Sequence, residues 1–138
     1  MGVVRLHQLA IQRSEEAVTS GALCPLTTRV ERCAGPDDQA FELRHLMGSP
    51  PQHLRPAGPK PNPFLPWDQR LELEPVGSNH VLIMNKYPVQ IGHMLLISRR
   101  WAPQTGWLTP LDWQAVHAVR QLSLIHISEP TRPRLISY

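Results

Sequence analysis

The stretch HVLIMNKYPVQIGHMLLIS, residues 80–98, carries the strongest structural signal in the sequence. It opens with an apolar run at 80–84 and closes with a second one at 93–98. Short apolar runs bounded by turn residues are typical of buried strands. The residues between them include Pro88 and Gly92, which favour a turn. The spacing therefore predicts two buried antiparallel strands.

The residues before this pair predict a helix and three further strands. Residues 4–18 repeat apolar side chains every three or four positions, as an amphipathic helix does. Residues 23–33 and 41–45 flank the turn-forming sequence Gly-Pro-Asp-Asp and predict a hairpin. Alternation of leucine and glutamate at 71–74 predicts a short edge strand.

A proline-rich segment, residues 50–66, separates the hairpin from the edge strand. Its seven prolines exclude a helix or a central strand, because each removes a backbone donor. We expect an extended segment at the surface. Phe64, Leu65 and Trp67 are expected to fix its end to the core.

A second helix is predicted after the buried pair. Thr109-Pro110-Leu111-Asp112 combines a threonine cap, a proline at the first position and an acid at the third. The apolar stripe of this helix is predicted to be Leu111, Ala115 and Ala118. Three tryptophans near it could form a shelf for a nucleobase, but their spacing favours core packing; they are Trp101, Trp107 and Trp113.

Length and composition restrict the possible classes of protein. At 138 residues and 15.6 kDa, the chain suffices for one modest domain, and 18% charged residues exclude highly charged disorder. A net charge of +3 is far from that of a dedicated nucleic-acid binder. No apolar run reaches the length of a membrane span, and the start is not a secretory signal. We expect a cytoplasmic protein that binds neither nucleic acid nor membrane.

The last segment, residues 122–138, differs in character from the rest. Its sequence, LSLIHISEPTRPRLISY, matches the conceptual translation of a transposon-end adapter used in short-read DNA libraries. The match covers 122–132 and 136–138, and the three residues between them correspond to a sample index. We expect 122–138 to be a non-native tail and 1–121 to be the front part of a longer domain. A sheet that is only half built would leave apolar residues uncovered.

Polar residues that directly follow a buried strand are the best candidates for a site. Asn85 and Lys86 offer an amide and an ammonium, which suit ribose hydroxyls and phosphate oxygens. Spacing alone favours a turn asparagine and a solvated lysine. His93 could be a base, although a structural histidine bonded to a backbone carbonyl is favoured. Arg99 and Arg100 could bind an anion, although a solvated strand end is favoured.

Several common site motifs do not occur in the sequence. We find no phosphate-binding P-loop, no Gly-x-Gly-x-x-Gly and no Gly-x-Ser-x-Gly. The seven histidines never fall at the spacings of a local metal site. We therefore assign no metal ligand.

Three blocks of sequence nevertheless resemble a known family. They are KPNPFLPW at 60–67, HVLIMNKYPVQIGHMLLISRRW at 80–101 and LTPLDW at 108–113. They resemble the N-terminal part of diadenosine tetraphosphate phosphorylases, also called ATP adenylyltransferases, of the histidine-triad (HIT) superfamily. More loosely, residues 21–31 and 41–44 are similar to the leading hairpin of that family.

The resemblance implies a fold and an activity. The fold would be α+β, an antiparallel sheet with flanking helices, HIT-like and incomplete in this chain. The enzymes split diadenosine tetraphosphate with phosphate into ATP and ADP through a nucleotidyl-histidine intermediate, and no cofactor is implied. Their nucleophile lies in a His-x-His-x-Gln motif after the second helix. No such motif occurs here, so we assign no catalytic residue and expect this chain to be inactive.

The resemblance also implies binding residues and a partner. Asn85 and Lys86 match the family's substrate-contacting Asn-Lys pair. A family lysine has no counterpart here, and Arg55 is the nearest cation. The expected partner is a small nucleotide, namely a diadenosine polyphosphate or ATP, together with phosphate.

Two other interpretations stay open from the residues alone. The chain could be a complete, non-catalytic nucleotide-binding module. It could also be an interaction protein whose proline-rich segment engages SH3- or WW-type partners.

Overall fold

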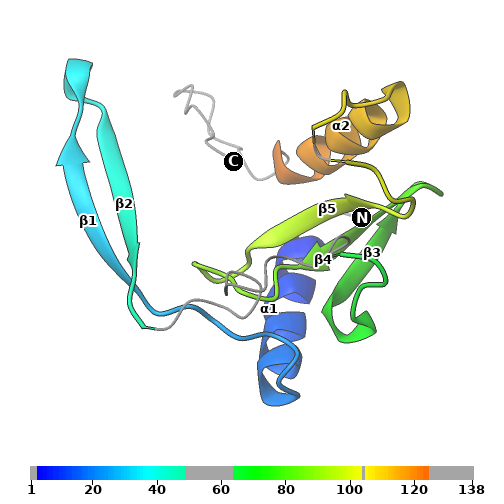
Figure 1. The fold of residues 1–138 in the computed structure, drawn as a ribbon, viewed down its shortest axis with the longest axis horizontal. Coiled ribbons are helices and arrows are strands. Elements are labelled where there is room, and N and C mark those ends of the chain that lie inside the picture. The colour runs from blue at the N-terminus through cyan, green and yellow to red at the C-terminus, as the bar shows by residue number, and fades with distance from the viewer. Residues whose placement is uncertain (1–2, 49–63, 104, 125–138) are drawn as a thin grey trace.

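Two strands form the predicted antiparallel pair at the centre of the molecule, in a computed structural model that describes residues 3–48, 64–103 and 105–124 (Figure 1). The helices and strands, in chain order, are α1 (Val3–Thr19), β1 (Thr28–Ala34), β2 (Ala40–Leu46), β3 (Glu72–Val76), β4 (His80–Met84), β5 (Met94–Ser98) and α2 (Pro110–Leu124). Short 3₁₀ turns cover Pro36–Asp38 and Gln69–Leu71. Three predictions concern residues outside the described ranges: those for Arg55, for the proline-rich segment up to residue 63 and for the tail from 125 onward.

The central sheet has the order β3-β4-β5 and is antiparallel throughout. β4 pairs with β5 from His80↔Ser98 to Met84↔Met94. All five residues of β4 are buried, whereas Ile97 alone is buried in β5. The prediction of two buried strands is therefore right for β4 and only partly right for β5. The reason is position, because β4 lies between two strands and β5 lies at an edge.

The two faces of this sheet bury different partners. Leu82 and Met84 belong to one apolar cluster with residues of α1 and α2. Val81 and Ile83 alternate with them and face the other way, where they contact the segment 64–67. This contact confirms that Phe64, Leu65 and Trp67 fix the end of the proline-rich segment to the core.

Helix α1 confirms the predicted amphipathic pattern. Leu6, Ala10 and Ala17 are buried on one side of it and pack in the cluster that contains Leu82. After the helix, Leu23 is also buried in that cluster. The strand begins only at Thr28 rather than at residue 23, because the backbone N–H groups of residues 23, 24 and 26 donate to Ala17, Lys86 and Pro88 and not to β2.

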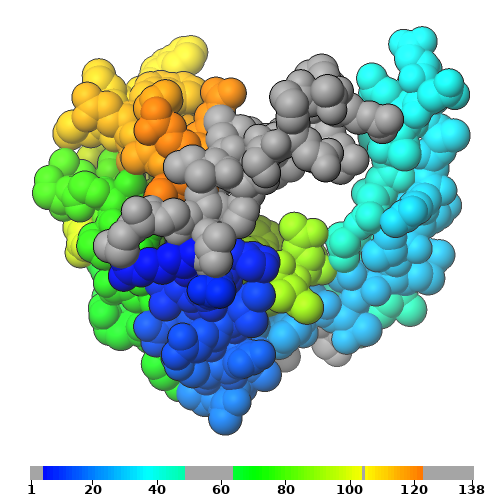
Figure 2. Space-filling model, turned by 180° about the vertical axis from the view of Figure 1, so that it is seen from behind, coloured from blue at the N-terminus to red at the C-terminus, as the bar shows by residue number. Residues whose placement is uncertain are grey.

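The hairpin β1–β2 forms as predicted but stands away from the body of the molecule (Figures 1 and 2). Its register runs from Thr28↔Leu46 to Ala34↔Ala40. All seven residues of β2 are exposed, including Phe41 and Leu43. The expectation of uncovered apolar residues is confirmed for the part of the chain that the structure describes.

Helix α2 begins where the sequence predicts, but a different side faces inward. Of the expected stripe only Ala115 is buried, and Leu111 is half exposed. The residues that pack inward are Ala115, Val119 and Leu122, and they continue a three-four-three spacing that starts at Asp112. Because the first residue of this inward side, Asp112, is polar, apolar periodicity alone does not indicate it.

The prediction of core packing for the three tryptophans is wrong. Trp101, Trp107 and Trp113 have 58%, 100% and 59% of their surface exposed. Trp113 belongs to α2, which presents its Ala115 side to the sheet, whereas Trp101 and Trp107 precede the helix and lie outside both apolar clusters. None of the described helices is long and apolar enough to cross a membrane.

Candidate functional site

Asn85 and Lys86 lie at the end of the central strand, in the turn that leads to β5. The Asn85 backbone N–H donates to the carbonyl oxygen of His93 at 2.9 Å, which closes the turn. The Asn85 side-chain oxygen accepts a hydrogen bond from the backbone N–H of Tyr87 at 3.1 Å. Asn85 is half-buried. Its side chain is held by a hydrogen bond within its own turn, as is typical of a turn asparagine.

His93 is brought directly beside Asn85. Its Nδ1 lies 3.4 Å from the Asn85 side-chain nitrogen. The sequence favoured a structural histidine bonded to a backbone carbonyl, and its ring instead contacts an amide. Gly92 precedes His93 with a φ of +79°, a conformation that residues with a side chain disfavour. This glycine lets the turn place His93 beside Asn85.

Lys86 is exposed and its ammonium lies 5.5 Å from the centre of the Tyr87 ring. Its backbone oxygen accepts from the Cys24 N–H at 2.8 Å, so the main chain is fixed while the side chain is accessible. The pKa of Asp68 is lowered, mainly by hydrogen bonds from Arg70 and also by the charge of Lys86. The ammonium therefore lies within electrostatic reach of that carboxylate.

Arg44 approaches the same turn from the hairpin. Its guanidinium donates to the backbone oxygen of Val89 at 3.0 Å and pairs with Glu42. The turn thus has a lysine and an arginine close to it, contributed by different elements. Residues 85–89 form the candidate site that the predicted pair of Asn85 and Lys86 indicates.

The structure does not bring Arg99 and Arg100 into this site. They follow β5 at its other end, and both are exposed, as the favoured interpretation states. The Arg99 guanidinium lies over the Trp67 ring at 5.4 Å. Arg100 contacts the Asp112 carboxylate at 3.5 Å.

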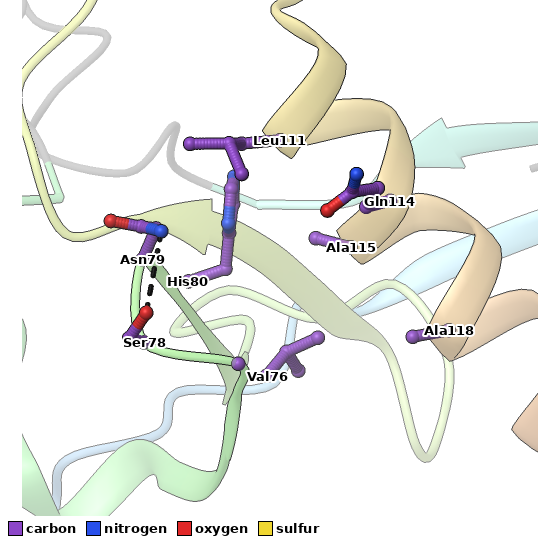
Figure 3. A pocket seen from close by; sticks show the side chains of 9 residues that line it. Val76, Ser78, Asn79, His80, Leu111, Gln114, Ala115 and Ala118 are labelled. Carbon is purple, nitrogen blue, oxygen red and sulfur yellow. Dashed lines mark hydrogen bonds between the residues drawn. The ribbon is translucent and has the colours of Figure 1, made fainter.

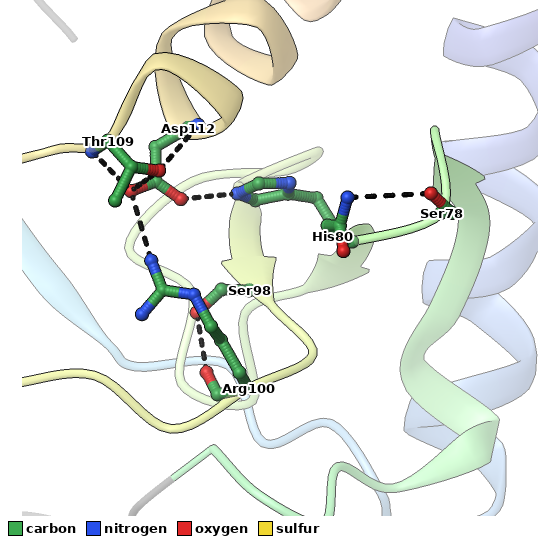
Figure 4. Close-up of polar contacts among 7 residues, drawn as sticks. Ser78, His80, Ser98, Arg100, Thr109 and Asp112 are labelled. Atoms are coloured by element: carbon green, nitrogen blue, oxygen red, sulfur yellow. Dashed lines mark hydrogen bonds and ion pairs between the residues drawn. The ribbon is translucent and has the colours of Figure 1, made fainter.

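A buried histidine–aspartate contact is the feature that the sequence reasoning missed. His80 Nε2 lies 2.7 Å from Asp112 Oδ1, and the two side chains are 7% and 14% exposed (Figure 4). The other carboxylate oxygen accepts from both the backbone N–H and the hydroxyl of Thr109, at 2.7 and 2.8 Å. The Asp112 backbone N–H in turn donates to the Thr109 hydroxyl at 3.3 Å, which confirms the predicted threonine cap, and the His80 contact ties this cap to β4.

The surroundings of Asp112 stabilise its ionised form. Hydrogen bonds from Thr109, followed by that from His80, lower the pKa of this carboxyl from 3.8 to about 2. A signal for the contact was available in the sequence. Alternation along β4 places His80 on the same face as Leu82 and Met84, which is the face that α2 covers.

A small cavity of about 210 Å³ lies beside this contact, between the β3–β4 turn and helix α2 (Figure 3). Its polar wall consists of Ser78, Asn79, His80 and Gln114. It is at the opposite end of β4 from Asn85, so the cavity and the candidate site are separate. Within the described ranges, no three His, Cys, Asp or Glu side chains gather where they could hold a metal ion.

A family model described as the Ap4A phosphorylase N-terminal domain matches residues 3–125. The chain belongs to this family. Ap4A is diadenosine tetraphosphate, so the match agrees with the resemblance drawn from the three sequence blocks. No curated protein sequence matches the chain.

Solved structures support the fold of this Ap4A phosphorylase N-terminal domain. The chain is similar to yeast Ap4A phosphorylase Apa2 in complex with AMP, with a TM-score of 0.63, 21% identity and coverage of 83% of this chain and 38% of that one. Apa2 in complex with Ap4A gives 0.63, 22%, 83% and 38%. The α+β class and its antiparallel sheets are thereby confirmed. The chain spans less than half the length of these relatives.

Proposed function

We propose that this domain binds the polyphosphate of a dinucleotide such as Ap4A, or of ATP, at the turn formed by residues 85–89. The observation that carries the proposal is the family match over residues 3–125, which contains the Asn85-Lys86 pair at the end of β4. The similar yeast structures are complexes with AMP and with Ap4A, which supports a nucleotide as the ligand.

The hydrogen-bonding capacity of the turn favours a phosphate. The Asn85 side-chain oxygen already accepts from Tyr87, so the amide offers mainly its N–H groups to a ligand. The Lys86 ammonium has three donors and no acceptor. A site that offers these donors and an exposed ammonium suits anionic oxygens better than a hydroxyl or a nucleobase.

The whole reaction would need residues beyond those of the turn. A histidine nitrogen attacks an adenylyl phosphorus of Ap4A and releases ATP, and phosphate then displaces that histidine to give ADP. This route divides one difficult substitution into two easier ones. The sequence contains no His-x-His-x-Gln, so the 138-residue chain is expected to bind nucleotide without turning it over.

Titration calorimetry on the 138-residue chain tests this function. Ap4A and ATP should bind, and adenosine should bind far more weakly because it has no phosphate. Lys86→Ala should weaken ATP binding about tenfold, as loss of one charge-assisted hydrogen bond does. Arg32→Ala is the matched control, because it removes another exposed positive charge, from the hairpin.

Two results would contradict the proposal. The first is ATP affinity that Lys86→Ala and Arg32→Ala lower equally, since this would indicate unspecific attraction to positive charge. The second is phosphate-dependent cleavage of Ap4A by the purified 138-residue chain, which would show that the proposed dependence on His-x-His-x-Gln is wrong.

A further inference from the structure

The orientation of the Asn85 amide follows from one unambiguous donor. The backbone N–H of Tyr87 can only donate, so the Asn85 atom 3.1 Å from it is the oxygen. The other end of the amide, the nitrogen Nδ2, therefore is the atom that lies 3.4 Å from His93 Nδ1. The turn thus fixes which atom of the amide faces the histidine.

This orientation also fixes the protonation of the histidine ring in the contact. An amide nitrogen only donates hydrogen bonds, so a hydrogen bond at this contact requires His93 Nδ1 to accept and to be without a proton. The ring proton of neutral His93 is then on Nε2, because which nitrogen is protonated is set by the hydrogen bond at the other one. The second N–H of the Asn85 amide takes no part in these two contacts.

We propose that His93 is a positioning residue of the nucleotide site, whose unprotonated Nδ1 holds the Asn85 amide so that its second N–H can donate to a phosphate oxygen. The proposal rests on the proposed function of the turn. Main-chain geometry supports it, because the Asn85 N–H donates to the His93 oxygen at 2.9 Å. Residue 93 therefore holds Asn85 through both its backbone and its side chain.

The turn sequence explains how this pair comes together. Asn85 directly follows β4 and His93 directly precedes β5, and the register pairs Met84 with Met94. Asn85 and His93 consequently face each other just beyond the last paired residues of β4 and β5. Gly92, with its φ of +79°, allows the chain to reverse immediately before His93.

Two substitutions separate positioning from a general structural role. His93→Leu removes the acceptor but keeps a side chain of moderate size. His93→Asn keeps an acceptor, because its side-chain oxygen can take a position close to that of Nδ1. We expect His93→Leu to weaken ATP binding about fivefold, the effect of one ordinary hydrogen bond, and His93→Asn to stay within about twofold of the unchanged chain.

Equal affinity of His93→Leu and the unchanged chain would overturn the proposal. Equal weakening by both substitutions would overturn it as well, since it would show that an acceptor at residue 93 is irrelevant. Circular dichroism of both variants identifies any that does not fold.

A second measurement needs no substitution and no nucleotide. Long-range ¹H–¹⁵N spectra of the labelled chain at pH 8 should show His93 with its proton on Nε2 and with Nδ1 unprotonated. A proton on Nδ1 would contradict the positioning role. If the unchanged chain binds no ATP, the proposed function fails, and this spectrum still decides whether His93 holds the Asn85 amide.

Discussion

The two ends of strand β4 use polar residues in opposite ways. At the first end, His80 is buried and its Nε2 is directed at Asp112, whose other oxygen caps helix α2. At the second end, Lys86 is exposed, and the Asn85 amide keeps one N–H beyond its contacts within the turn. We call the first end the closed end, because contacts within the chain hold His80, and the second the open end, because the Lys86 side chain is exposed. Stability should therefore depend on the first end and nucleotide affinity on the second.

The largest effect on stability is expected at the closed end. His80→Ala removes a buried ring and leaves Oδ1 of Asp112 without its hydrogen bond, so the free energy of unfolding should fall by about 2–3 kcal/mol. Urea denaturation monitored by circular dichroism measures this. The matched control is His117→Ala, because His117 is an exposed histidine on α2 that contacts only Gln121 among the described hydrogen bonds. Equal stability of the two variants would remove the distinction between the ends.

A pH-dependent effect is expected from the same end. The pKa of Asp112 is lowered from 3.8 to about 2, so its ionised form stabilises the folded chain above about pH 4. This stabilisation should be lost as the pH falls from about 4 to about 2. Thermal unfolding of the unchanged chain and of Asp112→Asn should therefore differ at pH 5 and converge near pH 2. A difference that stays constant over this range would show that the carboxylate charge is unimportant.

The smallest effect on stability is expected at the open end. Lys86→Ala removes an exposed side chain whose ammonium lies over the Tyr87 ring and interacts only weakly, through its charge, with the Asp68 carboxylate. The free energy of unfolding should change by less than about 0.5 kcal/mol, as for most surface substitutions. The same urea experiment checks this. A loss as large as that of His80→Ala would mean that Lys86 supports the turn rather than a ligand.

Local patterns predicted most elements of the fold. The apolar run of β4, the amphipathic spacing of α1 and the Thr109 cap each depend on residues close together in the chain. The hairpin was also predicted, because a turn sequence between two alternating segments is a local signal. The prediction that Leu122 begins a non-native tail is untested, although Leu122 packs on the core as part of α2.

Predictions that depended on the sheet's neighbours were less successful. Trp113 was expected in the core and is 59% exposed, because an aromatic residue alone does not indicate which side of α2 meets the sheet. The rotation of α2 is set by Asp112 and by Ala115, one polar and one small, and neither stands out in an apolar pattern. The half-buried state of β5 likewise follows from its edge position.

The sequence by itself determined the family, the antiparallel strand pair and the Asn85-Lys86 candidate, because apolar runs, turn sequences and motifs depend on residues that are close together in the chain. Only the tertiary structure brought His80 to Asp112, over 32 positions, and set His93 beside the Asn85 amide. Contacts of this kind depend on how a helix rotates against a sheet and on how a turn closes. Those are decided by packing of the whole chain, which no local pattern contains.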